Sequence, residues 1–210
     1  MPDSAPKHDT FLIPGMTPKK ASGPFPQADQ PVSGRPQLAD KSAPVVQPVS
    51  RRFVMITEVR GCLFRSDAQA LVNTVNCVGP MGRGIAREFK QRYPEMYEAY
   101  RSVCRRGLLR PGMILPYTGA DKLILNFAVK DHWRNPSSHA WVEDCLARFV
   151  VHYERLGVTS VALPRLGAEN GWIAWEPTYE LIYRYLGELP IEVELVHFDP
   201  ALRVNLPARV

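Results

Sequence analysis

The chain has 210 residues and a formal net charge of +5, which leaves room for one ordinary domain with an appendage or for two very small ones. Its four cysteines form no CxxC pair and no Cys/His cluster, which speaks against a structural zinc site and fits reduced thiols in a cytoplasmic protein. No run approaches the roughly 18 apolar residues of a membrane span, and we expect neither a span nor a signal peptide. The thinly spread positive charge is compatible with a nucleic-acid partner but does not require one.

Residues 1–50 have the composition of a tail. They contain half of the 20 prolines, within stretches that are also rich in serine and glutamine. Such segments bury too little apolar surface to offset the entropy of ordering the chain. We therefore expect a disordered, Pro-rich tail over residues 1–50 and a single folded domain over residues 51–210.

Strands and helices alternate after the tail. Phe53–Val59 and Ala70–Val75 carry the alternating or β-branched apolar pattern of strands. A glycine-rich stretch follows, and then a helix from about Gly84. Pro94 suits the first position of the next helix, which Gly107 is expected to end.

The second half of the chain continues this pattern. Met113–Tyr117 and Lys122–Ala128 predict two strands joined around Gly119–Asp121. Ser138 is expected to cap a long amphipathic helix, and Gly157 to close it.

The last elements complete an α/β pattern. Ser160–Pro164 predicts a buried strand, Pro177–Leu186 a helix, and Ile191–Phe198 a final strand. Because strands alternate with helices, we expect a mainly parallel sheet with helices on both faces.

Three loops leave predicted strands at the same edge of this sheet. They are Asn76–Arg83, Val129–Ser138 and Arg165–Trp175, all rich in Gly, Asn, His, Lys or Trp. Open α/β sheets bind their ligands beyond the carboxyl ends of the strands. The sequence therefore predicts a ligand site where these three loops meet.

The first of these loops suits a phosphate group. Its glycines, from Gly79 to Gly84, allow a ligand close to the backbone, and the free N–H groups of the following helix favour an anion such as a diphosphate. Ile85 stands where a Walker A loop needs lysine, and Arg87 where a dinucleotide fingerprint needs its last glycine. On the glycines alone, a tight strand-to-helix turn without a ligand has equal weight.

Further motifs resemble the macrodomain family, in particular the branch of the DarG antitoxins and the terminal ADP-ribose glycohydrolase. The resemblance covers Phe53 to Phe198. The matching residues are Val72-Asn-Thr-Val-Asn-Cys-Val-Gly79, Met81-Gly-Arg-Gly-Ile-Ala86, Phe89-Lys90, Tyr93-Pro-Glu95, Asn126-Phe-Ala-Val-Lys-Asp-His-Trp-Arg134, Leu163-Pro-Arg-Leu-Gly167, Asn170-Gly171 and Trp175-Glu176.

The resemblance implies a three-layer α/β/α fold with a mixed, mainly parallel sheet of about six strands, and a site for ADP-ribose without cofactor or metal. Lys130 matches the lysine that attacks the anomeric carbon of the ribose, and His132 its nearby helper. Asn76 is expected beside the distal ribose, and the Gly82–Ile85 backbone around the phosphates. The implied ADP-ribose contacts are Cys62, Asn73, Asn76, Gly79, Met81, Gly82, Arg83, Gly84, Ile85, Leu166, Gly167, Ala168, Glu169, Asn170 and Gly171.

Three positions depart from the family pattern. Cys62 stands where the family commonly has an aspartate that contacts the adenine amino group, and Glu169 brings a negative charge close to the expected diphosphate. Gly171 takes the place of an aspartate that assists the lysine in the glycohydrolase relative. These departures bear more on catalysis than on binding.

Three hypotheses of function follow. The leading one is a lysine-dependent glycohydrolase that removes ADP-ribose from ADP-ribosylated DNA. The others are an ADP-ribose reader without activity and a hydrolase of small ADP-ribose derivatives. A cognate ADP-ribosyltransferase toxin is a candidate partner, and we expect a monomer.

Overall fold

The computed structural model describes residues 56–200. The predicted tail over residues 1–50 therefore lies outside the described residues. Within the described range, no helix is both long and apolar enough to cross a membrane.

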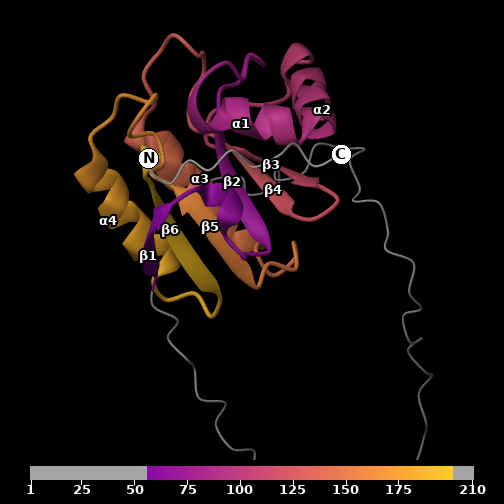
Figure 1. Ribbon diagram of the computed structural model, residues 1–210. Coiled ribbons are helices and arrows are strands. Elements are labelled where there is room, and N and C mark those ends of the chain that lie inside the picture. The colour runs from indigo at the N-terminus through magenta and orange to yellow at the C-terminus, as the bar shows by residue number, and fades with distance from the viewer. Residues whose placement is uncertain (1–55, 201–210) are drawn as a thin grey trace, which may run out of the picture.

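A six-stranded sheet forms the centre of the fold (Figure 1). Its strands follow the order β1-β6-β5-β2-β4-β3, and all neighbours are parallel except β3, which pairs antiparallel with β4. The strands are β1 (Thr57–Gly61), β2 (Ala70–Val75), β3 (Ile114–Thr118), β4 (Leu123–Ala128), β5 (Ser160–Pro164) and β6 (Glu192–Phe198). The expected mixed, mainly parallel sheet is confirmed.

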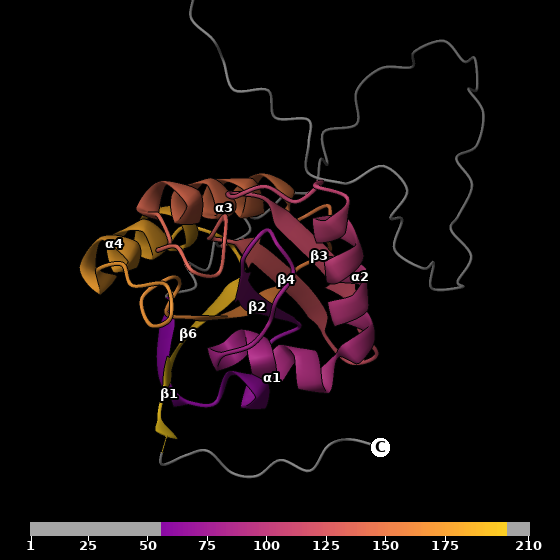
Figure 2. The same cartoon turned by 90° about the horizontal axis from the view of Figure 1, so that it is seen from above.

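Helices cover both faces of this sheet, as Figure 2 shows from above. The chain forms η1 (Leu63–Arg65), α1 (Gly84–Arg92), α2 (Pro94–Arg105), α3 (His139–His152) and α4 (Trp175–Leu186). Helices α3 and α4 pack on one face, and η1, α1 and α2 on the other. Strand β2 supplies both cores, because Val72 faces one and Leu71 the other, as the period of two in a strand requires.

Several element ends differ from the prediction. The first strand covers Thr57–Gly61, so its start lies later than expected, and residues 53–55 of the predicted strand are outside the described range. Helix α3 ends at His152 rather than Gly157; isolated turns follow, and Gly157, with a φ of +67°, closes the last of them. Ser138 takes the N-cap position, but its side chain makes no capping hydrogen bond. Helix α4 begins at Trp175, which places Pro177 in a first turn that needs no N–H donor.

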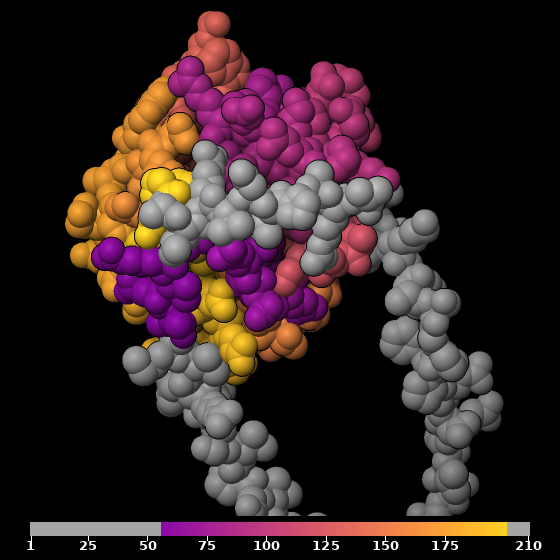
Figure 3. Space-filling view, in the orientation of Figure 1, coloured from indigo at the N-terminus to yellow at the C-terminus, as the bar shows by residue number. Residues whose placement is uncertain are grey.

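A polar cluster fastens the edge strand β1 to helix α4. One carboxylate oxygen of Glu58 accepts hydrogen bonds from the hydroxyls of Tyr179 (2.8 Å) and Tyr183 (2.9 Å). The other oxygen lies 2.8 Å from Nε2 of His197 on β6. Strand β1 and β6 share one face of the molecule with α4 in Figure 3. Glu58 thus links β1 to α4 and β6, whose partner side chains lie 121 to 139 residues later in the chain.

We expect this cluster to make the stability of the fold depend on pH. The hydrogen bonds from Tyr179, Tyr183 and His197 hold the pKa of Glu58 below its usual value of 4.5. A lowered folded-state pKa gives stability that is full above the unfolded value and is lost as the pH falls through the folded value. Melting temperatures of wild type and Glu58→Gln from pH 7 to pH 3 should therefore converge at the acid end. A difference in melting temperature between the two proteins that stays constant over this pH range would contradict the role of the Glu58 charge.

Candidate functional site

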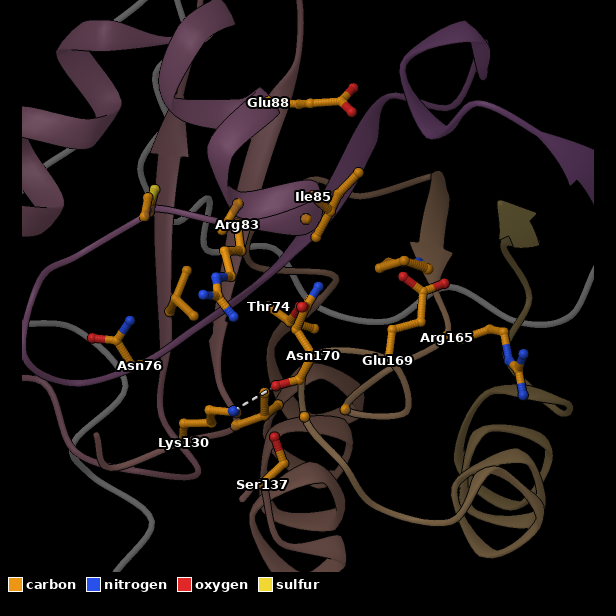
Figure 4. A pocket seen from close by; sticks show the side chains of 18 of the residues that line it. Thr74, Asn76, Arg83, Ile85, Glu88, Lys130, Ser137, Arg165, Glu169 and Asn170 are labelled. Carbon is orange, nitrogen blue, oxygen red and sulfur yellow. Dashed lines mark hydrogen bonds between the residues drawn. The ribbon is translucent and has the colours of Figure 1, made fainter. Parts of the chain in front are cut away.

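The three predicted loops meet around one cavity at the carboxyl edge of the strands. Its volume is about 600 Å³, within the range of small-molecule sites. Figure 4 shows Arg83 and Ile85 from the start of α1 on one side of the cavity and Lys130 and Ser137 on the other. The predicted site residues that line it are Cys62, Asn76, Met81, Gly82, Arg83, Gly84, Ile85, Lys130, Gly167, Glu169, Asn170 and Gly171.

Five predicted site residues do not line the cavity. Asn73 is fully buried below the first loop, and its side chain donates a hydrogen bond to Oδ1 of Asn126 (2.8 Å). The ring of His132 stacks on Trp133 and does not share the cavity wall with Lys130. The other three are Gly79, Leu166 and Ala168. Asn73 and Leu166 therefore lie behind the wall, and His132 lies outside the lining of the cavity that contains Lys130.

Asn76 builds the first loop through both ends of its side-chain amide. Its Oδ1 accepts hydrogen bonds from the backbone N–H groups of Val78 and Gly79, each at 3.0 Å. Its Nδ2 donates to the carbonyl oxygen of Pro80 at 2.7 Å. The hydroxyl of Tyr100 donates to the Asn76 carbonyl at 2.7 Å. Asn76 thus fixes the curve that carries the loop into α1.

The beginning of α1 offers an anion-binding position. Neither an acidic residue in the first turn nor a side-chain cap from Arg83 occupies the free N–H groups of this helix. Gly84 has a φ of +54°, and the side-chain amide of Asn170 packs where a Cβ on Gly84 would stand. The two loops therefore close over the cavity at a point that only glycine allows.

We expect Gly84→Ala to weaken ligand binding while the fold survives. A left-handed alanine costs about 1–2 kcal/mol, and the new methyl group would push Asn170 away from the first loop. Calorimetry with ADP-ribose should show a loss of roughly tenfold or more. Gly107→Ala is the matched control, since Gly107 has a similar left-handed φ of +64° but does not line the cavity, and a Cβ there meets nothing within 4 Å. Equal affinities of the two variants would contradict closure at Gly84.

Lys130 lies two residues after the end of β4, which is Ala128, and is 9% exposed. Its Nζ donates a hydrogen bond to the carbonyl oxygen of Asn170 at 2.6 Å and lies 4.3 Å from the ring centroid of Trp172. Burial lowers the pKa of Lys130 from its usual 10.5, and the neighbouring Asp131 carboxylate partly offsets this shift. An amine with a lowered pKa is more readily neutral and hence nucleophilic.

Comparisons with known proteins identify the family to which this fold belongs. The family model described as "Macro domain" matches residues 72–182, which is more than half of the chain. The chain belongs to the macrodomain family.

Individual relatives show which macrodomains this chain resembles in sequence and structure. A protein of Mycobacterium tuberculosis named "DNA ADP-ribosyl glycohydrolase" is 44% identical over 151 residues, which are 70% of this chain and 43% of the relative. The solved structure of the macrodomain of Mycobacterium tuberculosis DarG is 42% identical, with a TM-score of 0.65, over 70% of this chain and 99% of that chain.

A third relative combines two activities in its name. It is the "DNA ADP-ribosyl transferase-DNA ADP-ribosyl glycohydrolase fusion protein" of Thermosipho africanus, 31% identical over 65% of this chain and 40% of its own length. The structure of Thermosipho africanus DarTG in complex with ADP-ribose is 29% identical, with a TM-score of 0.63, over 72% of this chain and 44% of that chain. The present chain spans about two fifths of the length of these curated relatives.

The departures from the macrodomain pattern all lie at the cavity. Cys62 lines it at the start of η1, and Glu169 lines it with an exposed side chain. Gly171 cannot take a side chain as the loop stands, because a Cβ there would overlap the Gly167 carbonyl. The third loop therefore has no room for a carboxylate at position 171.

The cavity also contains residues that were not predicted as site residues. Ser137 and Trp172 lie in the second and third loops, and Phe198 lies at the end of β6. The hydroxyl of Ser137 and Nε of Arg165 are buried without a hydrogen-bond partner in the described part of the chain. The sequence indicated these residues only through the polar and aromatic composition of the loops. Composition does not show which side chains of a loop face the cavity.

Proposed function

We propose that this macrodomain binds ADP-ribose and removes it from ADP-ribosylated DNA, with Lys130 as the nucleophile. The observation that carries the proposal is a lysine, buried at the cavity wall, across from a glycine-rich helix N-terminus. The helix N-terminus suits the diphosphate of ADP-ribose, and the lysine suits the distal ribose that is attached to it. The cavity of about 600 Å³ is large enough for a dinucleotide-sized ligand.

The diphosphate would lie against the first turn of α1. The backbone around Gly82 and Gly84 exposes N–H groups there, and Arg83 adds a positive charge at the wall. Glu169 lines the same cavity and opposes an anion, so binding depends on the helix N–H groups and Arg83 outweighing that carboxylate. The adenine of the ligand would then lie near Cys62 and Phe198, on the side of the cavity away from Lys130.

The reaction can be written with the lysine alone. The neutral Nζ of Lys130 forms a bond to the anomeric carbon, the bond from that carbon to the base breaks, and its electron pair stays on the base. The proton that the amine loses balances the proton that the base gains. Opening of the sugar ring gives an imine, and water then releases ADP-ribose and the free lysine. The predicted proton transfer through His132 has no support in this arrangement, because His132 does not line the cavity.

The choice of DNA as the modified macromolecule is supported by the names of the relatives. Two exposed arginines that line the cavity, Arg83 and Arg134, agree with it, since their positive charge would favour a polyanion. The Thermosipho africanus fusion protein supports a further part of the proposal, namely an ADP-ribosyltransferase whose product this chain consumes. We also propose a monomer, and a cytoplasmic location in keeping with four cysteines that are all free.

The test is release of ADP-ribose from an ADP-ribosylated DNA oligonucleotide by the full chain. The proposal predicts free ADP-ribose and the unmodified oligonucleotide as products. Binding of ADP-ribose by calorimetry without any release would instead show a reader. Release only from small acetylated or phosphorylated ADP-ribose derivatives would show a small-molecule hydrolase, and either result would overturn the proposed activity.

A further inference from the structure

Lys130 has two close contacts, and both come from the third loop. The carbonyl oxygen of Asn170 accepts the hydrogen bond from Nζ at 2.6 Å, and the ring of Trp172 lies below Nζ with its centroid 4.3 Å away. A cation within about 6 Å over the face of an indole is attracted by the ring. The nucleophile predicted for the site is therefore held by a segment some forty residues later in the chain.

Trp172 holds its ring there at a conformational cost. Among residues 56–200, it is the non-glycine residue with a left-handed backbone, at a φ of +60°. A bulky residue in this region is rare, and such strain persists only where the surroundings impose it. The loop on its N-terminal side is fixed by a hydrogen bond of 2.8 Å from the N–H of Ser137 to the carbonyl of Gly171.

The ring is not placed there by burial. Trp172 is 60% exposed at the cavity wall, so hydrophobic packing does not explain its position. Trp133 also lines the cavity at 46% exposure, but the cation over its ring is Arg134, at 4.6 Å. Of these two exposed indoles, only Trp172 has the lysine over its face.

We propose that Trp172 is a positioning residue that holds the amino group of Lys130 at the place from which it attacks. This inference rests on the proposed function, and it names a residue of the third loop as part of the same site. A lysine side chain has four rotatable bonds and loses much freedom when it is ordered. One hydrogen bond to Asn170 lets the chain swing about that contact, whereas the ring supplies a second contact that limits the swing. The ring face attracts the ammonium form as a cation, and it still accepts an N–H···π contact from the neutral amine that attacks.

The test compares Trp172→Ala with Trp172→Phe on the ADP-ribosylated oligonucleotide. Both variants keep the same left-handed strain, so they differ in the ring alone. We expect kcat to fall about 10–100-fold in Trp172→Ala, as for a misplaced catalytic group, with KM and ADP-ribose affinity within about threefold of wild type. Trp172→Phe should recover most of the lost kcat, because it restores an aromatic face.

A spectroscopic measurement shows the contact without relying on turnover. In protein labelled with ¹³C at the lysine ε carbon, the ring current of Trp172 should shift the Lys130 ε-methylene protons upfield. Lys130→Arg identifies the resonance. The shift should disappear in Trp172→Ala, persist in reduced form in Trp172→Phe, and remain in Trp133→Ala. Melting temperatures of the variants confirm that they are folded.

The outcomes separate this inference from the proposed function. A wild type that releases no ADP-ribose would overturn the proposed function and this inference together. An active wild type with unchanged kcat in Trp172→Ala would overturn only the positioning role. A rise in KM with unchanged kcat would do the same and would show that Trp172 acts in substrate binding instead. A Trp172→Phe variant as impaired as Trp172→Ala would also reject the aromatic contact.

Discussion

Lys130→Ala is expected to lower the rate of ADP-ribose release by at least about 10³-fold, because it removes the proposed nucleophile. The affinity for ADP-ribose should change by only a few-fold, since the proposed diphosphate cradle consists of the first loop and the start of α1. Single-turnover release and calorimetry measure these two quantities separately. In wild type, the rate should rise with pH through the lowered pKa of Lys130, since the neutral amine is the reactive form.

Lys130→Arg is the matched control for this prediction. It keeps a long cationic side chain, so a contribution of positive charge alone would survive in it, whereas nucleophilic attack would not. An equal loss of rate in the alanine and arginine variants supports Lys130 as the nucleophile. A rate that remains within tenfold of wild type in either variant would reject it.

Asn76→Ala is expected to have the largest effect on binding. It removes an acceptor for the N–H groups of Val78 and Gly79 and a donor to Pro80, so the first loop loses the side chain that holds its curve. At roughly 0.5–1.5 kcal/mol for each hydrogen bond, the free energy of unfolding should fall by about 2–4 kcal/mol. ADP-ribose affinity should fall by roughly 100-fold, because the N–H groups of the cradle are no longer aligned.

Asn76→Asp separates the two halves of this amide. It keeps the acceptor for Val78 and Gly79 but loses the donor to Pro80 and adds a negative charge near the phosphate loop. Denaturant unfolding should place its stability between wild type and Asn76→Ala, while its ADP-ribose affinity stays low. Wild-type affinity in Asn76→Ala would contradict the loop-building role.

The fold was predictable to a large extent because local chemistry agrees with it. The β-branched run in Ala70–Val75 follows from a strand buried on both faces, and Pro94 and Gly107 mark the ends of α2 for backbone reasons. The end of α3 was wrong because the turns between His152 and Gly157 keep apolar residues at helical spacing. Periodicity reports which residues are buried, and not whether each hydrogen bond of a helix is made.

The site was predictable as a set of loops more than as a set of side chains. Lys130 was found through its motif, and the glycines through the backbone conformations that they allow. Asn73 belongs to the motif Val72–Gly79 that leads into the first loop, yet it faces the core and bonds to Asn126. The contact between Lys130 and Trp172 depends on how two separate loops meet, which no local pattern specifies.

The most direct test of the account is to trap the covalent intermediate on the protein. Wild-type chain is mixed with ADP-ribosylated DNA and a borohydride reagent, which reduces an imine to a stable amine, and the modified peptide is located by mass spectrometry. The account predicts one ADP-ribosyl group attached to the peptide that contains Lys130, and none in Lys130→Arg. Efficient release of ADP-ribose with no adduct, or an adduct at another lysine, would contradict it.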